Sequence, residues 1–327
     1  MQIIRWGILG PGNIARKFST GLRDLAGAKI QAVASSNMER AQEFAKDFQV
    51  PNVYDKYEKL ANDPDVDIIY VATTHNFHEE HALLCIEAGK SVLVEKPIAT
   101  NLIQAENIVR AAREKGVFLM EAMWTRFIPA WVEIRKWLKE ERIGKIKYVK
   151  ADFGFFAEWD PLNRKFNPAL AGGALLDIGI YPIALAYMIF EEEPSYVGSF
   201  ASLCETGVDE QSSYLFGYEN GAMAELSSCF TGETYREALI MGSKGQIRVP
   251  LFWKAQEAFL LMHGEEEQHF EFSYDHFGLQ CQAEWVMQAL REKKQETAWM
   301  PWSESLRIMK RMDSLRASWG MKYPWES

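Results

Sequence analysis

The stretch SVLVEKP, residues 91–97, decides how the rest of this sequence is interpreted. Its aliphatic run predicts a short strand that is buried on both faces, as in a parallel sheet. The strand ends in Glu95, Lys96 and Pro97, which place a carboxylate, an ammonium and a fixed backbone angle at one point. Because ligands of open α/β sheets bind at the carboxyl ends of the strands, Glu95 and Lys96 are expected to face a bound molecule.

A glycine-containing turn, GPGNIA at residues 10–15, follows a predicted strand over residues 3–9. Glycine at the first and third positions allows a tight turn and lets the backbone approach a diphosphate, toward which the N–H groups of the following helix point. A helix and a second strand, residues 30–35, complete a βαβ unit. The alternative is a glycine turn that binds no ligand. The pattern predicts a dinucleotide site that includes Gly10, Gly12, Asn13 and Ile14.

The end of the second strand is expected to distinguish NAD from NADP. An acidic residue there would bind the ribose hydroxyls of NAD, but the segment is ASSNMER, residues 34–40, without a carboxylate at the strand tip. Ser35 and Ser36 can hydrogen-bond a phosphate, and Arg40 can neutralise it. We therefore predict NADP, with NAD as the alternative if Ser36 or Asn37 only caps the next helix.

Three histidines follow a third predicted strand, residues 68–72, at positions 75, 78 and 81. Their spacing is possible for metal ligands on a helix, but no cluster of carboxylates or cysteines completes a tetrahedral set. The sequence therefore predicts no metal site. Thr73, His75 and His78 are instead expected to line the cofactor cleft.

Five βα steps fit into about the first 120 residues, the size of one doubly wound dinucleotide domain. The last strand of this set is expected at 117–121, so the predicted domains are 1–121 and 122–327. From residue 146 onward the pattern changes to strands and hairpins, with turn residues at 219–221 and 243–245. This second domain is expected to form a mostly antiparallel sheet, with helices over 279–292 and 303–319 closing the chain.

The composition limits the class of partner. The 327 residues include 36 basic and 45 acidic side chains, a formal charge of −9, which argues against nucleic acid or an anionic membrane as a partner. The N-terminus lacks the pattern of a signal peptide, and no apolar run is expected to reach the length of a membrane span. A cytoplasmic enzyme with a small-molecule substrate is the resulting expectation.

Three motifs together resemble the Gfo/Idh/MocA family of NAD(P)-dependent oxidoreductases: the glycine turn, the EKP strand end and DIGIY at 177–181. The segments EAMWTRF at 121–127 and ADFG at 151–154 resemble the branch with dimeric dihydrodiol dehydrogenases, also described as NADP-dependent D-xylose 1-dehydrogenases. The resemblance implies an α/β protein: an N-terminal Rossmann doubly wound parallel sheet, then an α/β domain with a large, open, mostly antiparallel sheet. The exposed face of that sheet commonly makes the subunit interface, so a homodimer is expected.

Two positions depart from the wider family. Tyr181 stands where many members have a histidine, and Thr74-His75 stands where many have Pro-Asn. Sugar and inositol dehydrogenases of the histidine type are therefore poorer guides to the substrate. The family also often has a cis bond before the proline of EKP, an isomer that the sequence leaves open.

Asp177 and Tyr181 lie at i and i+4 of a predicted helix over residues 174–190, which places both on one face. A buried Asp177 needs a partner, and Lys96 is the expected one. A free tyrosine titrates near pH 10, and a nearby ammonium favours the phenolate. We predict Tyr181 as the acid/base, Lys96 as the group that lowers its pKa, and Asp177 as the orienting carboxylate. In the alternative, Asp177 pairs locally and Tyr181 is a core aromatic.

Trp124, Arg126 and Phe153 are candidate substrate residues, because an aromatic wall suits the apolar face of a pyranose or a dihydrodiol ring. The predicted reaction transfers a hydride between NADP and a secondary alcohol or hemiacetal carbon of a sugar or vicinal diol. Two alternatives stay open: a non-catalytic NADP-binding redox regulator, and a sugar epimerase or glycosidase that retains its NAD.

Overall fold

The computed structural model describes residues 1–326, and the chain divides into two compact units that are both discontinuous in sequence. The first unit is Met1–Phe127 with Tyr274–Met309, and the second is Ile128–Ser273 with the residues from Lys310 onward. Residues 274–309 therefore return to the first unit, whereas the division expected at residue 121 keeps each domain continuous.

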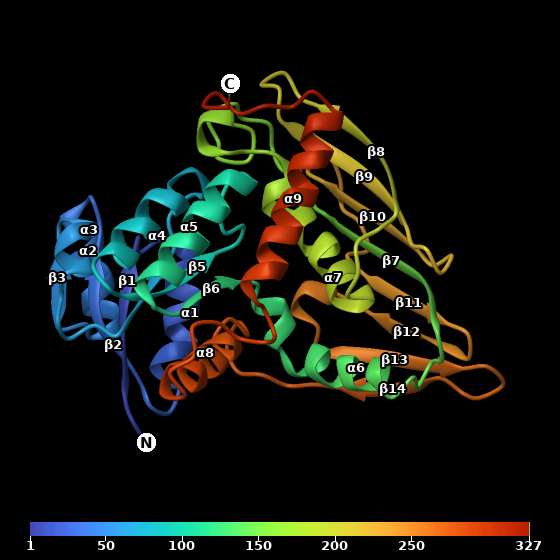
Figure 1. The fold of residues 1–327 in the computed structure, drawn as a ribbon, viewed down its shortest axis with the longest axis horizontal. Coiled ribbons are helices and arrows are strands. Elements are labelled where there is room, and N and C mark those ends of the chain that lie inside the picture. The colour runs from blue at the N-terminus through green and yellow to red at the C-terminus, as the bar shows by residue number, and fades with distance from the viewer. Residues whose placement is uncertain (327) are drawn as a thin grey trace. The chain divides into compact units, whose positions relative to one another are not determined.

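A six-stranded parallel sheet forms the centre of the first unit, in the order β3-β2-β1-β4-β5-β6 (Figure 1). The order reverses between β1 and β4, which is the point where doubly wound sheets bind ligands. The predicted doubly wound sheet is confirmed. Its strands are β1 (Ile4–Leu9), β2 (Ala28–Ala34), β3 (Asn52–Tyr54), β4 (Ile68–Val71), β5 (Ser91–Glu95) and β6 (Leu119–Ala122).

Strand β5 has the environment that its aliphatic run predicts. Val92, Leu93 and Val94 are fully buried, and β5 pairs in parallel with β4 on one side and β6 on the other. The peptide bond between Lys96 and Pro97 is cis. The sequence missed β3, because its three residues are only half-buried and form a short edge strand.

Helices of the first unit begin and end at recognisable signals. The Asn101 side chain caps α5 by accepting from the Gln104 N–H, and Gly116 ends this helix in the left-handed conformation. Helix α1 packs its buried Phe18 against the sheet, with ring centroids 5.4 Å from Trp6 and 4.2 Å from Tyr70. The elements are α1 (Asn13–Arg23), α2 (Met38–Phe48), α3 (Tyr57–Ala61), η1 (His75–Phe77), α4 (His78–Glu87), α5 (Leu102–Lys115), η2 (Trp124–Phe127) and α8 (Cys281–Arg291).

The second unit contains an eight-stranded sheet in the order β14-β13-β12-β11-β7-β10-β9-β8. All neighbours pair antiparallel except β7 and β10, which run parallel, so the predicted mostly antiparallel sheet is confirmed. The predicted turns at 219–221 and 243–245 join β9 to β10 and β11 to β12. The strands are β7 (Ile146–Gly154), β8 (Tyr196–Leu203), β9 (Asp209–Gly217), β10 (Met223–Cys229), β11 (Ala238–Gly242), β12 (Gly245–Val249), β13 (Glu257–Met262) and β14 (Gln268–Glu271).

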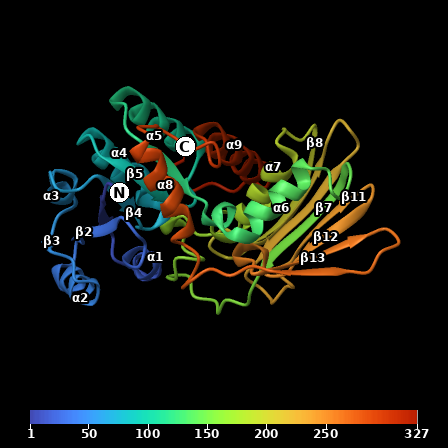
Figure 2. The same cartoon turned by 90° about the horizontal axis from the view of Figure 1, so that it is seen from below.

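Helices cover one face of this sheet, and among the described residues no helix covers the opposite face (Figure 2). Helix α7 is buried on all sides, which matches its apolar composition. Helix α9 begins in the first unit and ends in the second. The elements are α6 (Pro129–Lys139), η3 (Pro168–Leu170), the π-helical η4 (Leu175–Gly179), α7 (Ile180–Phe190), η5 (Phe252–Lys254) and α9 (Trp302–Ser318).

The expectation that no apolar run reaches the length of a membrane span is wrong, because one stretch has the length and the apolar composition of such a span. Residues Pro168–Phe190 form a helical stretch of 23 residues that is apolar enough, and 94% of its most apolar window is buried inside the protein. A helix in the core of a protein can be as long and as apolar as a membrane span. The burial of this stretch identifies it as part of the core.

The helix with Asp177 and Tyr181 is irregular just before Pro182, a residue without a backbone N–H. The irregularity is a π-helical turn over Leu175–Gly179, in which the Ile180 N–H reaches the carbonyl of Leu175. Such turns widen a helix locally and are frequent at functional sites. Asp177 lies within the π-turn, and Tyr181 lies in the first turn of α7.

Candidate active site

The glycine turn after β1 has the geometry of a diphosphate cradle. Gly10 has φ +85°, and the first intrahelical bond of α1 runs from the Arg16 N–H to the Gly12 carbonyl, so the preceding N–H groups have no acceptor within the helix. No side chain caps this helix, and its first turn has no acidic residue. A Cβ atom at Gly12 would meet no protein atom within 4 Å. The Gly10 and Gly12 N–H groups donate to the Ala34 and Gly10 carbonyls, so the N–H groups of the first helical turn are the ones that suit an anionic group. Cofactor binding by Gly10, Gly12, Asn13 and Ile14 stays a prediction.

Thr73 at the end of β4 packs against this turn, because a Cβ atom on Gly10 would lie 2.8 Å from Thr73 Cγ2. His75 is half-buried in η1, and its ring centroid lies 5.7 Å from that of His78. The structure thus brings Gly10, Thr73, His75 and His78 to the same edge of the sheet, next to the switch point.

The segment after β2 exposes four polar side chains, those of Ser36, Asn37, Glu39 and Arg40. Asn37 caps α2 by accepting from the Arg40 N–H at 3.0 Å, and the Asn37 N–H donates to Ser35 Oγ at 3.1 Å. The capping role considered for Ser36 or Asn37 therefore belongs to Asn37. The side chains of Ser36 and Arg40 are exposed, so this strand end presents a hydroxyl and a guanidinium.

His78 is fully buried between two backbone carbonyls. Its Nδ1 lies 2.7 Å from the Pro97 carbonyl oxygen, and its Nε2 lies 3.0 Å from that of Thr73. Burial lowers the pKa of His78 from 6.5 to about 4, so the ring is neutral at pH 7 and donates to one of the two. His78 has no exposed surface, and any effect on a cofactor acts through the backbone of Thr73 and Pro97.

The neutral His78 is expected to make stability fall at acidic pH. The folded protein keeps the ring neutral down to about pH 4, while the unfolded chain protonates it near 6.5, so this stability is present above pH 6.5 and is lost as the pH falls to 4. The loss corresponds to roughly 3 kcal/mol at about 1.4 kcal/mol per tenfold change. Urea unfolding from pH 7 to 4 should show this loss in the wild type relative to His78→Gln. The exposed His263→Gln is the control, and parallel curves for wild type and His78→Gln would contradict the prediction.

Glu95 is buried beneath Lys96. Its carboxyl accepts a hydrogen bond from the Tyr70 hydroxyl, and the Lys96 N–H donates to Glu95 Oε2 at 3.2 Å. Burial raises the pKa of Glu95, and the Tyr70 bond and the Lys96 charge oppose this rise. Glu95 therefore supports Lys96, whose own side chain is partly exposed at the strand end.

Trp124 and Arg126 are both buried in η2 of the first unit. The Arg126 guanidinium forms an ion pair with the buried carboxylate of Glu304 and donates to the Trp299 carbonyl at 3.2 Å. These contacts give Arg126 a structural role within its unit. The substrate role predicted for Trp124 and Arg126 stays a prediction.

In the second unit, Asp177 forms an ion pair with Arg164, whose Nη1 lies 3.2 Å from the Asp177 Oδ1. The sequence missed Arg164, which lies in the segment between β7 and η3. Asp177 itself is only 8% exposed, so the half-exposed guanidinium compensates a mostly buried charge. Arg164 belongs to the same unit as Asp177, so this ion pair is a local pairing of the kind that the alternative describes. The predicted pairing of Asp177 with Lys96 stays a prediction.

Tyr181 lies beside an aromatic pair. Its ring centroid is 5.5 Å from that of Phe153, and Phe153 stacks on Trp253 at 4.2 Å with an interplanar angle of 28°. Trp253 is half-buried and was not among the predicted site residues. The structure therefore joins Tyr181, Phe153 and Trp253 into one wall of the second unit.

Gly172 and Gly173 lie where the chain passes close to other atoms of the second unit. A Cβ atom at Gly172 would lie 2.8 Å from the Lys165 carbonyl oxygen and 2.9 Å from that of Arg164. At Gly173, with φ +116°, a Cβ atom would overlap Oδ1 of Asp209. The two glycines allow the chain to pass its own loop and a buried carboxyl.

Comparisons with known proteins cover almost the whole chain. Residues 4–123 match the model of the Gfo/Idh/MocA oxidoreductase family with an NAD-binding Rossmann fold, and residues 131–248 match the Gfo/Idh/MocA C-terminal domain. A trans-1,2-dihydrobenzene-1,2-diol dehydrogenase from Danio rerio is 37% identical over 334 residues, covering 99% of each chain. The chain belongs to the Gfo/Idh/MocA family.

Other Gfo/Idh/MocA relatives agree with this placement. The Xenopus tropicalis trans-1,2-dihydrobenzene-1,2-diol dehydrogenase is 35% identical over 98% of this chain and 99% of its own. Among solved structures, the 3-ketoreductase KijD10 from Actinomadura kijaniata, in complex with NADP and TDP-benzene, has a TM-score of 0.86 and 26% identity over 97% of this chain and 98% of its own. Variants of KijD10 that replace a lysine by alanine or a tyrosine by phenylalanine were crystallised with the same two molecules. This Gfo/Idh/MocA protein is accordingly an NAD(P)-dependent oxidoreductase.

Proposed function

We propose that this enzyme transfers a hydride between NADP and a secondary alcohol or hemiacetal carbon of a sugar or vicinal diol. The observation that carries the proposal is the full-length similarity to trans-1,2-dihydrobenzene-1,2-diol dehydrogenases, at 37% identity to the Danio rerio enzyme. Residues 1–121 are proposed to hold the cofactor, and residues 122–327 the substrate and the subunit interface.

Tyr181 is proposed to exchange the proton of the reaction. When bound, the nicotinamide ring supplies the acceptor or donor of the hydride. Tyr181 removes the proton from the substrate hydroxyl during oxidation and returns it to the carbonyl oxygen during reduction. The Lys96 ammonium favours the phenolate form of Tyr181 and holds the substrate oxygen. Asp177 orients Lys96 and the substrate, and the Arg164 guanidinium lies beside its carboxylate.

The stacked rings of Phe153 and Trp253 are proposed to bind the ring of the substrate. A flat aromatic surface beside the Tyr181 ring suits the apolar face of a pyranose and also a dihydrodiol ring. Trp124 of the first unit is proposed as a further substrate residue. The support for Trp124 is its aromatic side chain. Arg126 of the same element already forms an ion pair with Glu304, so it is the weaker candidate.

The exposed Ser36 and Arg40 support the choice of NADP, since together they can bind a 2′-phosphate. Replacing Arg40 by alanine is expected to lower kcat/KM for NADP by about ten- to a hundredfold and to leave the value for NAD almost unchanged. Steady-state rates with each cofactor measure this. Lys46→Ala, an exposed cation on the same helix, is the control. An Arg40→Ala enzyme with the wild-type ratio of NADP to NAD activity would refute the assignment.

The absorbance of the reduced nicotinamide tests the function directly. With NADP and a panel of vicinal diols and aldoses, the wild type should accumulate free NADPH. Absence of turnover with every member of the panel would favour a redox regulator. Consumption of substrate without free NADPH would favour an epimerase or glycosidase that keeps its cofactor bound.

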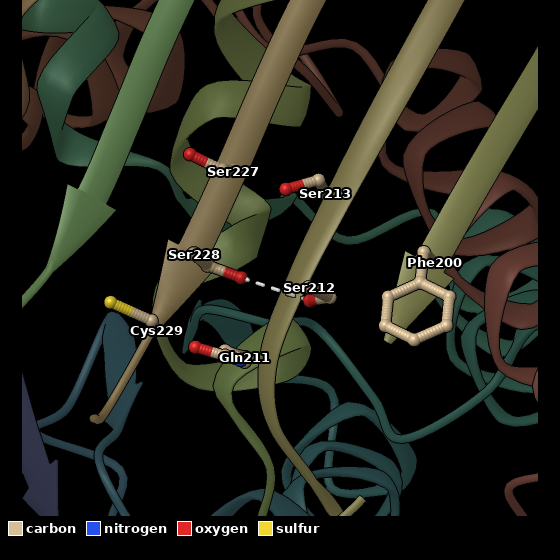
Figure 3. Close-up of a pocket in the computed structure, with 7 residues that line it drawn as sticks. All are labelled: Phe200, Gln211, Ser212, Ser213, Ser227, Ser228 and Cys229. Carbon is tan, nitrogen blue, oxygen red and sulfur yellow. Dashed lines mark hydrogen bonds between the residues drawn. The ribbon is translucent and has the colours of Figure 1, made fainter. Parts of the chain in front are cut away.

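A homodimer through the bare face of the eight-stranded sheet is proposed as the assembly. This face exposes large apolar side chains, including Tyr196 at 60% and Phe200 at 76% (Figure 3 shows Phe200), with Leu215 and Met223 also exposed. These side chains come from three neighbouring strands, β8, β9 and β10, and exposed apolar surface on one sheet face suits an interface. Light scattering tests the assembly.

A cytoplasmic location is also proposed, and the burial of the apolar run at 168–190 is compatible with it.

A further inference from the structure

Asp209, the first residue of β9, is a buried carboxyl with an unusual partner. It is 0% exposed, and its Oδ2 accepts from the Leu175 N–H at 2.8 Å and from the Ser212 hydroxyl at 3.1 Å. Within residues 1–326, no hydrogen-bond partner reaches its Oδ1. Burying a carboxyl with one unsatisfied oxygen costs stability, so its retention needs a reason.

The bond to Leu175 reaches the start of the helix with the proposed catalytic groups. Leu175 is the first residue of η4, the π-turn that includes Asp177 and continues into α7 with Tyr181. The residue at the N-cap position is Ala174, whose side chain cannot accept a hydrogen bond. Asp209 therefore caps this helix from a strand, and its carboxylate lies at the positive end of the helix dipole.

A second restraint comes from Gly173. Its φ of +116° turns the chain so that the position of a Cβ atom falls on Asp209 Oδ1, while its N–H donates to the Lys165 carbonyl at 2.8 Å. On the other side, the Tyr323 hydroxyl donates to the Gly172 carbonyl at 2.7 Å. The segment that enters η4 is thus held between Asp209 and its own loop.

Three buried hydroxyls hold the Asp209 side chain in turn. Ser212 lies 2.7 Å from the Tyr214 hydroxyl and 3.2 Å from that of Ser228, and Tyr214 lies 2.7 Å from Ser228. Figure 3 shows Ser212 and Ser228 facing each other across β9 and β10. Burial raises the pKa of Asp209 to about 6, and the Leu175 and Ser212 bonds oppose this rise. Through Ser212, the cluster holds Oδ2 of Asp209 toward the Leu175 N–H.

We propose that Asp209 is a positioning residue, which holds Asp177 and Tyr181 in place by capping η4 from β9. The role in catalysis rests on the proposed function, while the capping of η4 does not. Asp209 acts through the Leu175 N–H and touches neither cofactor nor substrate.

Two replacements that keep the branched shape of the side chain separate the cap from simple packing. Asp209→Asn keeps an oxygen that accepts from Leu175, and Asp209→Leu removes it. Amide hydrogen exchange of the peptide 174–181 should be at least about tenfold faster in Asp209→Leu than in the wild type, and within about threefold in Asp209→Asn. Asp63→Leu is the control, because Asp63 is a buried carboxyl of the first unit, bonded to Asn52 and Tyr54. It should leave exchange at 174–181 unchanged. If Asp209→Leu does not fold, Asp209→Ala removes the same acceptor.

The kinetic readout follows from the same geometry. In Asp209→Leu, kcat should fall by at least about tenfold with an unchanged KM for NADP, and Asp209→Asn should recover most of it. A folded Asp209→Leu protein with wild-type exchange at 174–181 would overturn the proposal, whatever its activity. Faster exchange with unchanged kcat would overturn the role in catalysis. If the wild type turns over no diol or aldose, the proposed function fails, and the exchange experiment still decides the cap.

Discussion

Replacing Tyr181 by phenylalanine is expected to lower kcat by about 10²- to 10⁴-fold, because the substrate hydroxyl loses its proton acceptor. The ring remains, so its contact with Phe153 and the packing of α7 should be kept. KM for NADP and the unfolding temperature should therefore change little. Steady-state kinetics with NADP and a vicinal diol or aldose measure the loss.

Tyr187→Phe is the matched control for this experiment. Tyr187 lies in the same helix, is also buried, and has its hydroxyl bonded to Glu193 and Arg311. It should retain wild-type kcat and lose only some stability. If Tyr181→Phe keeps most of its kcat, the proton must be transferred by Lys96 or Asp177, and the assignment of Tyr181 is wrong.

Replacing Lys96 by methionine is expected to lower kcat by about a hundredfold or more, because the phenolate of Tyr181 and the substrate oxygen lose a positive charge. Methionine has a similar length, so the strand end should keep its packing. The loss of charge also removes a group that opposes the raised pKa of Glu95. Kinetics with saturating NADP separate this effect from weaker cofactor binding.

A titration of NADP binding completes the test of Lys96. Binding should weaken by less than about tenfold, since the glycine turn and the β2 end supply most of the proposed contacts. Lys29→Met, an exposed lysine of β2, is the control and should leave both quantities unchanged. A Lys96→Met enzyme that loses NADP binding but keeps kcat at saturation would restrict Lys96 to the cofactor.

Local patterns predicted the elements that surround the cofactor edge. The aliphatic run at 91–95 became the buried β5, and the glycine turn at 10–15 became the exposed start of α1. Hairpin residues at 219–221 and 243–245 predicted two antiparallel pairs. These features depend on neighbours in sequence, because turn geometry and strand burial act over a few residues.

The sequence did not predict two ion pairs of buried side chains. Arg126 pairs with Glu304, which is 178 residues away, and Asp177 pairs with Arg164. Trp253 meets Phe153 because η5 follows β12, and β11 alone lies between β12 and β7 in the sheet. Such contacts are set by the packing of whole elements, and no local periodicity encodes them.

The sequence by itself determined the two kinds of sheet, the dinucleotide turn and the family, since burial of apolar runs and the freedom of glycine are local properties. The spacing of Asp177 and Tyr181 also follows from sequence, because four residues are about one helical turn. Only the tertiary structure decided that Arg164 meets Asp177 and that Asp209 caps η4. The physical reason is that a buried carboxyl needs a hydrogen-bond partner, and folding supplies it from whichever distant element packs beside it.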